Sequence, residues 1–192
     1  VMLVALVLLY GKALPILSWL AALGIIVLLV LESLSPGVSW SPYYKVTTQD
    51  YTNTNPPYTA IQVNGIPHQN VLDAESRLKI EPLYGRPYER AVDNPLRNVL
   101  VIGAGTGTDV ALALSRGAQR VDAVEIDPRI QQIGREKNPN QPYADPRVTT
   151  YIDDGRAFLS RTDGEYDLIL FALPDSLTLV SGASQLRLES YL

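Results

Sequence analysis

Residues 99–109 read VLVIGAGTGTD, and this stretch decides the fold. The unbroken apolar run from Val99 to Ile102 is typical of a strand that is buried on both faces of a sheet. Glycines follow at once at Gly103, Gly105 and Gly107. Glycine lets a backbone turn sharply and lets a ligand approach it more closely than a Cβ would permit. Because apolar residues return at 110–114, the stretch predicts a buried strand, a ligand-binding loop and a helix in direct succession.

The same alternation continues along the rest of the chain. Apolar strands are expected over residues 121–126, 148–152 and 166–171. One helix is expected to begin after Asp127 and another to cover residues 156–160. Alternating strands and helices with apolar strands predict an α/β fold built on a doubly wound parallel sheet. Since the sequence stops at residue 192, we expect the C-terminal strands of this sheet to be missing.

Three segments precede the α/β part. Residues 59–97 are expected to hold a β-hairpin, because Asn64-Gly65 supplies the positive φ angles of a type I′ turn, and then a helical part. Residues 32–58 are rich in Ser, Pro, Thr, Tyr and Asn and are interpreted as a juxtamembrane linker with an edge strand. Residues 1–31 are expected to be one or two transmembrane segments, because Leu14 to Leu31 is 18 residues without a charge. A signal peptide and a buried core helix are the alternatives.

Composition excludes several classes of function. Residues 1–31 hold no acid and one base, Lys12, so the rest of the chain holds all 20 Asp and Glu against the other 15 Lys and Arg. Such an acidic balance gives no electrostatic reason to expect nucleic-acid binding. The chain has no cysteine and one histidine, His68. A zinc site built from Cys or paired His is thereby excluded, and no metal is expected.

The glycine spacing indicates the ligand. A dinucleotide-binding loop has glycine at its first, third and sixth positions, whereas the sixth position here is Thr108 and the third glycine comes fifth. The resulting G-x-G-x-G pattern is typical of S-adenosylmethionine-dependent transferases, and it disfavours NAD. Residues 98–192 are therefore interpreted as a nucleoside-binding domain. The cofactor expected at Gly103, Gly105 and Gly107 is S-adenosylmethionine or its decarboxylated form.

Two carboxylates are placed to complete a nucleoside site. Glu125 ends the second strand, 22 positions after Gly103, where it can accept hydrogen bonds from both ribose hydroxyls. Its charge would repel a 2′-phosphate and so disfavours NADP. Asp154 closes the third strand, where it can accept from the adenine amine. A solvated strand end is the alternative for Glu125, and a helix cap, which is compatible with binding, is the alternative for Asp154.

These motifs together resemble the spermidine synthase family, the polyamine aminopropyltransferases, and most closely its membrane-fused bacterial members. The resemblance covers residues 41–192. It implies an S-adenosylmethionine-dependent methyltransferase-like Rossmann fold and a small-molecule acceptor. In this family the acceptor is a polyamine. The family also has a cofactor-contacting Gln after its hairpin. Gln69 fills that place if the hairpin is one residue longer, and His68 lies beside it. Both can also be exposed hairpin residues. The matching segments are Ser41–Tyr44, Val63–Gly65, Val99–Gly107, Val124–Asp127, Asp154-Gly155 and Tyr166–Ile169.

The departures from the family concern the acceptor half of the site. The family places a catalytic Asp after the fourth strand, in an Asp-x-x-Asp-Pro run, and the aligned position here is Ala172. The second acid is kept as Asp175, which is the candidate catalytic residue, although Ser176 replaces the proline. Thr106 stands where the family's glycine loop carries Asp, and the family's Tyr-His-Glu stretch has no counterpart around residues 77–82.

Two functions follow as hypotheses. The first is a membrane-anchored, spermidine synthase-like transferase of unknown acceptor, integral to a membrane with its soluble domain facing the cytoplasm, where adenosyl cofactors are made. The second is a non-catalytic nucleoside-binding sensor or membrane scaffold with the same fold. Association into a homo-oligomer stays open in both.

Overall fold

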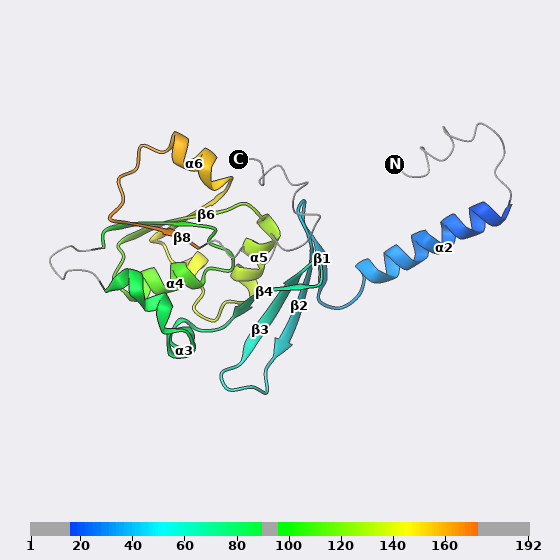
Figure 1. Cartoon of the computed structure of the whole chain (residues 1–192), viewed down its shortest axis with the longest axis horizontal. Coiled ribbons are helices and arrows are strands. Elements are labelled where there is room, and N and C mark those ends of the chain that lie inside the picture. The colour runs from blue at the N-terminus through cyan, green and yellow to red at the C-terminus, as the bar shows by residue number, and fades with distance from the viewer. Residues whose placement is uncertain (1–15, 90–95, 173–192) are drawn as a thin grey trace. The chain divides into compact units, whose positions relative to one another are not determined.

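The computed structural model describes residues 16–89 and 96–172 (Figure 1). The chain divides into two compact units, Val1–Val38 and Ser39–Leu192. The second unit contains both β-sheets apart from the first residue of strand β1. The candidate site is built within this second unit.

The first unit contains one described helix, α2 (Ile16–Ser33). The prediction of a transmembrane segment over residues 1–31 is wrong for the described part of the chain, where no helix is long and apolar enough to cross a membrane. The prediction that the protein is integral to a membrane, with its soluble domain facing the cytoplasm, is contradicted by the same finding. The last turn of the described helix contains Glu32 and Ser33. Residues 1–15 lie outside the described part of the chain.

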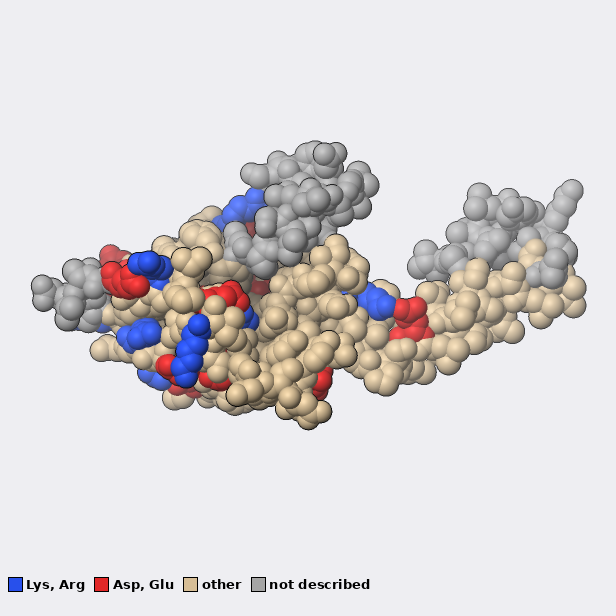
Figure 2. Space-filling view, turned by 60° about the horizontal axis from the view of Figure 1, so that its bottom comes forward, with Lys and Arg blue, Asp and Glu red and all other residues tan. Residues whose placement is uncertain are grey.

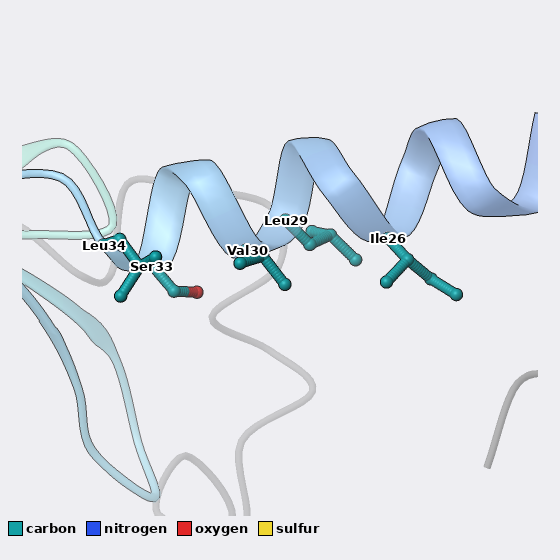
Figure 3. A pocket seen from close by; sticks show the side chains of 5 residues that line it. All are labelled: Ile26, Leu29, Val30, Ser33 and Leu34. Atoms are coloured by element: carbon teal, nitrogen blue, oxygen red, sulfur yellow. The ribbon is translucent and has the colours of Figure 1, made fainter.

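A hollow follows one side of the last turns of α2. Figure 3 shows its five lining side chains, which project to the same side of the helix: Ile26, Leu29, Val30, Ser33 and Leu34. Ser33 supplies the one polar group among them. A nucleoside site needs several convergent polar groups, so this hollow is not the candidate site.

The second unit begins with an antiparallel sheet of strands β1 (Val38–Trp40), β2 (Lys45–Tyr51), β3 (Tyr58–Val63) and β4 (Ile66–Val71), in that order. This sheet is larger than the hairpin and edge strand expected from the sequence. Asn64 and Gly65 make the β3–β4 turn with φ of 52° and 79°, the values that a type I′ turn needs. The register then shifts, because Gln62 pairs with Pro67 whereas Ile61 pairs with Gln69. His68 is the extra residue of this bulge.

Strands β5 (Asn98–Ile102), β6 (Arg120–Glu125), β7 (Val148–Ile152) and β8 (Leu168–Phe171) form a parallel sheet in the order β7-β6-β5-β8. Helices α4 (Thr108–Ser115), α5 (Pro128–Lys137) and α6 (Gly155–Arg161) connect them. Alternate residues of β5 pack on opposite faces: Val99 and Val101 share a core with Val110 of α4, and Leu100 shares one with Phe158 of α6. The two helices accordingly cover opposite faces of the sheet (Figure 1). This is the doubly wound arrangement of an α/β Rossmann-like fold.

Helix α5 joins the two sheets. Ile130 and Ile133 on one side of α5 pack with Val46, Ile61 and Val63 of the antiparallel sheet. The other connections are α3 (Ala74–Ile80) and two 3₁₀ helices, η1 (Pro82–Tyr88) and η2 (Pro142–Ala144). Because the antiparallel sheet packs against α5, its strand β4 lies near the carboxyl end of β5.

The surface in Figure 2 carries acidic and basic side chains side by side. Ion pairs at the surface of the described residues include Arg147 with Asp145 at 2.7 Å and Lys137 with Asp50 at 2.7 Å. The positive charges on this face are therefore not gathered into one strip of the kind that follows a nucleic-acid backbone.

Candidate functional site

The glycine loop follows β5 and opens α4. Gly103, Gly105 and Gly107 all have positive φ, at 75°, 55° and 89°. A Cβ on Gly105 would lie 3.1 Å from Nε2 of Gln69, and one on Gly107 would lie 2.7 Å from Cγ of Pro142. Backbone conformation therefore favours glycine at positions 105 and 107, and at position 107 the ring of Pro142 also leaves no room for a Cβ.

Glu125 ties the end of β6 to this loop. Its carboxylate is 8% exposed; Oε2 accepts from the Gly105 amide at 2.7 Å and Oε1 from the Asp127 amide at 2.9 Å. Burial raises the pKa of Glu125, and the backbone N–H groups of Asp127, Gly105 and Ile126 oppose that shift. The burial overturns the solvated-strand-end alternative. Each carboxylate oxygen keeps a further lone pair, so a bound hydroxyl could still be accepted.

Gln69 is brought to the loop by the bulge in β4. Its Oε1 accepts from Oγ1 of Thr106 at 2.8 Å, and Thr106 is fully buried. His68 is the bulge residue itself. The structure thus places Gln69 against the glycine loop.

Asp154 begins α6. Its Oδ1 accepts from the amides of Arg156 at 3.0 Å and Ala157 at 2.9 Å, and its Oδ2 lies 3.8 Å from Arg156. The helix-cap role is therefore present in the structure, and the carboxylate is partly exposed. A Cβ on Gly155 would collide with Cγ2 of Ile102, so α6 begins directly against the end of β5. Asp154 consequently lies at the same edge of the sheet as Gly103.

The candidate residues follow neighbouring strands at this carboxyl edge. Gly103 follows β5, Glu125 ends β6 and Asp154 follows β7. Ala172 follows β8, and its amide donates to the Ile102 carbonyl at 2.9 Å. Strand order reverses between β5 and β8, and ligands of open α/β sheets bind at such a switch point. Asp175 and Ser176 lie outside the described residues.

Sequence reasoning missed several residues that support the site. Tyr143 donates its hydroxyl to the Gly105 carbonyl at 2.7 Å, and Asn138 donates Nδ2 to the Thr106 carbonyl at 2.9 Å. Burial raises the pKa of Asp109, in the first turn of α4, to about 6, and the Arg77 charge partly opposes this. For Asp109 the sequence offered one indication, an acidic residue in an otherwise apolar helix. Tyr143 and Asn138 gave none, because they reach the loop through tertiary packing.

The acidic residues do not gather into a cation site in the part of the chain that the structure covers. Across residues 16–89 and 96–172, no group of three or more His, Asp or Glu side chains is arranged to hold a metal ion.

Comparison with known families identifies the domain. The family model described as "Spermine/spermidine synthase domain" matches residues 89–186, just over half of the chain. The chain belongs to the spermidine synthase family. This confirms the resemblance drawn from the glycine loop and the strand ends. The family match includes the whole parallel sheet and all the candidate residues except the two in the hairpin, His68 and Gln69.

Curated relatives match the same region. The polyamine aminopropyltransferase of Alkaliphilus metalliredigens is 36% identical over 88 residues, which cover 44% of this chain and 31% of the relative. That of Clostridium beijerinckii is 41% identical over 81 residues, 40% of this chain and 28% of the relative. The chain thus spans about a third of the length of the curated relatives that it matches.

Solved structures with a similar fold include a probable spermidine synthase from Corynebacterium glutamicum, with a TM-score of 0.53 at 18% identity, covering 80% of this chain and 56% of that one. A spermidine synthase solved in complex with the transition state analogue AdoDATO gives a TM-score of 0.54 at 18% identity, covering 72% and 47%. At this identity the likeness shows the fold alone.

Proposed function

We propose that this chain binds an adenosyl sulfonium donor, S-adenosylmethionine or its decarboxylated form, and acts as a spermidine synthase-like transferase. The observation that carries the proposal is the hydrogen bond between Glu125 and the Gly105 amide. It joins the carboxylate at the end of β6 to the glycine loop at the end of β5, so the two parts of a nucleoside site lie side by side. Membership of the spermidine synthase family supports the same choice of ligand.

Each residue of this edge has a part in binding. The glycines allow the donor to approach the backbone, and the free lone pairs of Glu125 are suited to accept from ribose hydroxyls. Oδ2 of Asp154 does not take part in the helix cap and can accept from an exocyclic amine. Gln69 covers Gly105 from the antiparallel sheet. A bound donor supplies an electrophilic carbon beside its sulfonium, and this chain's residues hold and orient it.

The acceptor is proposed to be a small molecule, with a polyamine as the choice that the family supports. An attacking amine must lose a proton, and a positioned base contributes typically 10²–10⁴-fold to such a step. Ala172 stands at the carboxyl end of β8, where the family resemblance places that base. This observation favours a second candidate function, a nucleoside-binding protein that does not catalyse transfer.

Calorimetric titration of the full-length protein tests the proposal. S-adenosylmethionine, its decarboxylated form or methylthioadenosine should bind, and NAD should not. Tight binding of NAD, or binding of none of the adenosyl compounds, would overturn it. Gly105→Ala should weaken binding, because the new Cβ would press on Gln69 and strain a φ of 55°. Gly117→Ala is the matched control, since Gly117 has a φ of 91° but no atom within 4 Å of its Cβ position.

Turnover separates the two candidate functions. The donor that binds is incubated with a panel of diamines and polyamines, and the sulfur-containing product of transfer is measured. Product formation that depends on an added amine supports the transferase. Donor binding without any turnover in the full-length protein supports the non-catalytic function.

A further inference from the structure

A hydrogen bond between two side chains fixes how the amide of Gln69 faces the glycine loop. Oγ1 of Thr106 donates to Oε1 of Gln69 at 2.8 Å. Thr106 is fully buried, and its hydroxyl makes no other hydrogen bond in the part of the chain that the structure describes. A buried hydroxyl needs an acceptor for its hydrogen. Because only the oxygen of the Gln69 amide can accept that hydrogen, Oε1 is the atom turned towards Thr106.

The nitrogen of the same amide is left as an accessible donor. Within the described ranges, Nε2 of Gln69 donates to no protein acceptor. It is also open to solvent, because the polar side-chain atoms that are buried without a partner in those ranges are Nε of Arg77 and Oδ2 of Asp127. Nε2 lies 3.1 Å from the position that a Cβ on Gly105 would take. An N–H donor that a ligand can reach therefore lies beside the middle of the glycine loop.

The order of the strands indicates which part of a bound donor meets Gln69. Asp154 follows β7, Glu125 ends β6 and the glycine loop follows β5, and these three strands are neighbours in that order. In the proposed function, Asp154 holds the adenine and Glu125 the ribose. The sulfonium and its side chain then continue along the same edge of the sheet to the loop after β5, where Gln69 lies against Gly105.

The two candidate donors differ in this side chain alone. Both carry an ammonium group on the third carbon from the sulfur, and S-adenosylmethionine carries a carboxylate on the same carbon. An amide N–H donates to a carboxylate in a charge-assisted hydrogen bond, whereas it has nothing to offer an ammonium group, which is itself only a donor. The observed orientation of the Gln69 amide therefore favours the donor that has the carboxylate.

We propose that Thr106 and Gln69 make the site selective for S-adenosylmethionine over its decarboxylated form. Gln69 contacts the carboxylate, and Thr106 is a positioning residue that acts through the orientation of the Gln69 amide. The decarboxylated form still binds through its adenosine, but more weakly. The inference rests on the proposed adenosyl site. An Asp at position 106, as in the family's glycine loop, can only accept; it would take Nε2 of Gln69 and turn Oε1 to the ligand.

Gln69→Glu tests the contact with the ligand. The glutamate can still accept from Thr106, and it places a negative oxygen where Nε2 was. Calorimetry on the full-length protein gives dissociation constants for both donors and for methylthioadenosine, which lacks the amino-acid end. The wild type should bind S-adenosylmethionine about 10- to 100-fold more tightly than the decarboxylated form. Gln69→Glu should reverse this preference and leave the affinity for methylthioadenosine unchanged.

Gln62→Glu is the matched control for charge. Gln62 is exposed on β3 of the same sheet, so the variant adds the same negative charge away from the loop and should keep the wild-type preference. Unchanged preference in Gln69→Glu, or a wild type that binds the decarboxylated form as tightly as S-adenosylmethionine, overturns this inference alone. A wild type that binds no adenosyl compound removes the proposed function and this inference together.

Thr106→Val and Thr106→Ser test the positioning. Valine removes the hydroxyl and lets either end of the Gln69 amide face the ligand, so the preference should fall to about threefold or less. Serine keeps the hydroxyl and should keep the preference. The affinity for methylthioadenosine shows that the adenosine part of the site is intact in each variant. A full preference in Thr106→Val would show that Thr106 does not set the amide. If Thr106→Val does not fold, Gln69→Glu and the wild-type preference decide the inference.

Discussion

Helix α5 approaches the glycine loop so closely that a Cβ on Gly134 would lie 2.7 Å from both the Cα and the carbonyl oxygen of Thr106. The obstacle is main chain, which cannot change rotamer to make room. Asn138 caps α5 four residues after Gly134, so the end of the helix meets the loop by close packing at Gly134 and by the hydrogen bond from Asn138. The shape of the loop is therefore set partly by a residue 28 positions downstream.

Gly134→Ala should destabilise the protein although alanine is the better helix former. Helix propensity alone would favour the change by up to about 1 kcal/mol. Displacing the loop backbone or the helix should cost about 1–3 kcal/mol, as overpacking of a core does, and so should outweigh it. The free energy of unfolding in urea measures the balance. Gly85→Ala is the control, because its Cβ would meet only Cδ2 of Leu78 at an ordinary 3.5 Å; a stabilised Gly134→Ala would contradict the close contact.

Asp109 should make the fold less stable as pH rises through the acid range. Its pKa is about 6 in the folded protein against 3.8 for an ordinary aspartate, so the folded state binds the proton more tightly than the unfolded state. Its contribution is therefore most favourable below pH 3.8 and falls until about pH 6, by roughly 3 kcal/mol at 1.36 kcal/mol per pKa unit. Asp109→Asn should remove this fall and be more stable than wild type at pH 7. Urea unfolding from pH 4 to 8 measures it.

Asp145 gives a control of opposite sign for the same titration. Its bond with Arg147 holds the pKa of Asp145 at about 2, below the ordinary 3.8. Its stabilising effect is therefore present above pH 3.8 and is lost as pH falls towards 2. Asp145→Asn should weaken the protein at pH 7 and leave the slope between pH 4 and 6 intact. A wild-type profile that is flat between pH 4 and 6, matched by Asp109→Asn, would show that Asp109 titrates normally.

Local patterns predicted the parts of the site that are local in the chain. The strand, loop and helix over residues 99–115 follow from an apolar run, three glycines and a returning helical pattern, and Glu125 follows from its place at the end of the next strand. Gln69 could be named but not placed, because its position depends on the bulge at His68. Its contact with Thr106 is visible only once the antiparallel sheet is docked on α5.

Two kinds of information were beyond the sequence. Tyr143 and Asn138 touch the loop from 38 and 32 positions away, and nothing in their neighbourhood indicates that partner. The membrane prediction failed for another reason. It rested on the length of the charge-free run alone, whereas among the described residues no helix is long and apolar enough to cross a membrane.

Glu125→Gln should weaken both ligand binding and the loop. The amide oxygen of Gln can replace one carboxylate oxygen, so either the Gly105 or the Asp127 amide is left facing an NH₂ group. We expect a loss of about 1.5–3 kcal/mol in binding, the size of hydrogen bonds to a charged group. Calorimetry gives the binding loss and urea unfolding the stability loss. Asp122→Asn is the control: Asp122 is 1% exposed on the same strand, so stability should fall while affinity stays constant.

If Glu125→Gln lost stability and kept full affinity, Glu125 would be a brace for the glycine loop and not a ligand contact. If affinity fell in Asp122→Asn by the same factor, the binding loss would reflect general weakening of β6. The intended role requires a loss in the first variant alone.

Ala172→Asp should create or strengthen aminopropyl transfer. The hydrogen bond from the Ala172 amide to the Ile102 carbonyl extends the pairing of β8 with β5 to the carboxyl edge, so a side chain at 172 stands beside the start of the glycine loop. Ala172 also packs against the apolar core under α4. A carboxylate there would be partly desolvated, which raises its pKa towards neutrality and makes it a better proton acceptor. Relative to a slow wild type, the rate with decarboxylated S-adenosylmethionine and putrescine should rise about 10²- to 10⁴-fold.

Ala172→Asn is the matched control, because it has the size of Asp without a group that takes a proton. Product formation is measured for wild type and both variants, with donor affinity measured in parallel so that a change in binding is not mistaken for a change in chemistry. A rise in Ala172→Asp alone would show that the donor and acceptor are already held and that the base is what the wild type lacks. Robust turnover in the wild type would contradict the prediction and make Asp175 the first residue to test as the base.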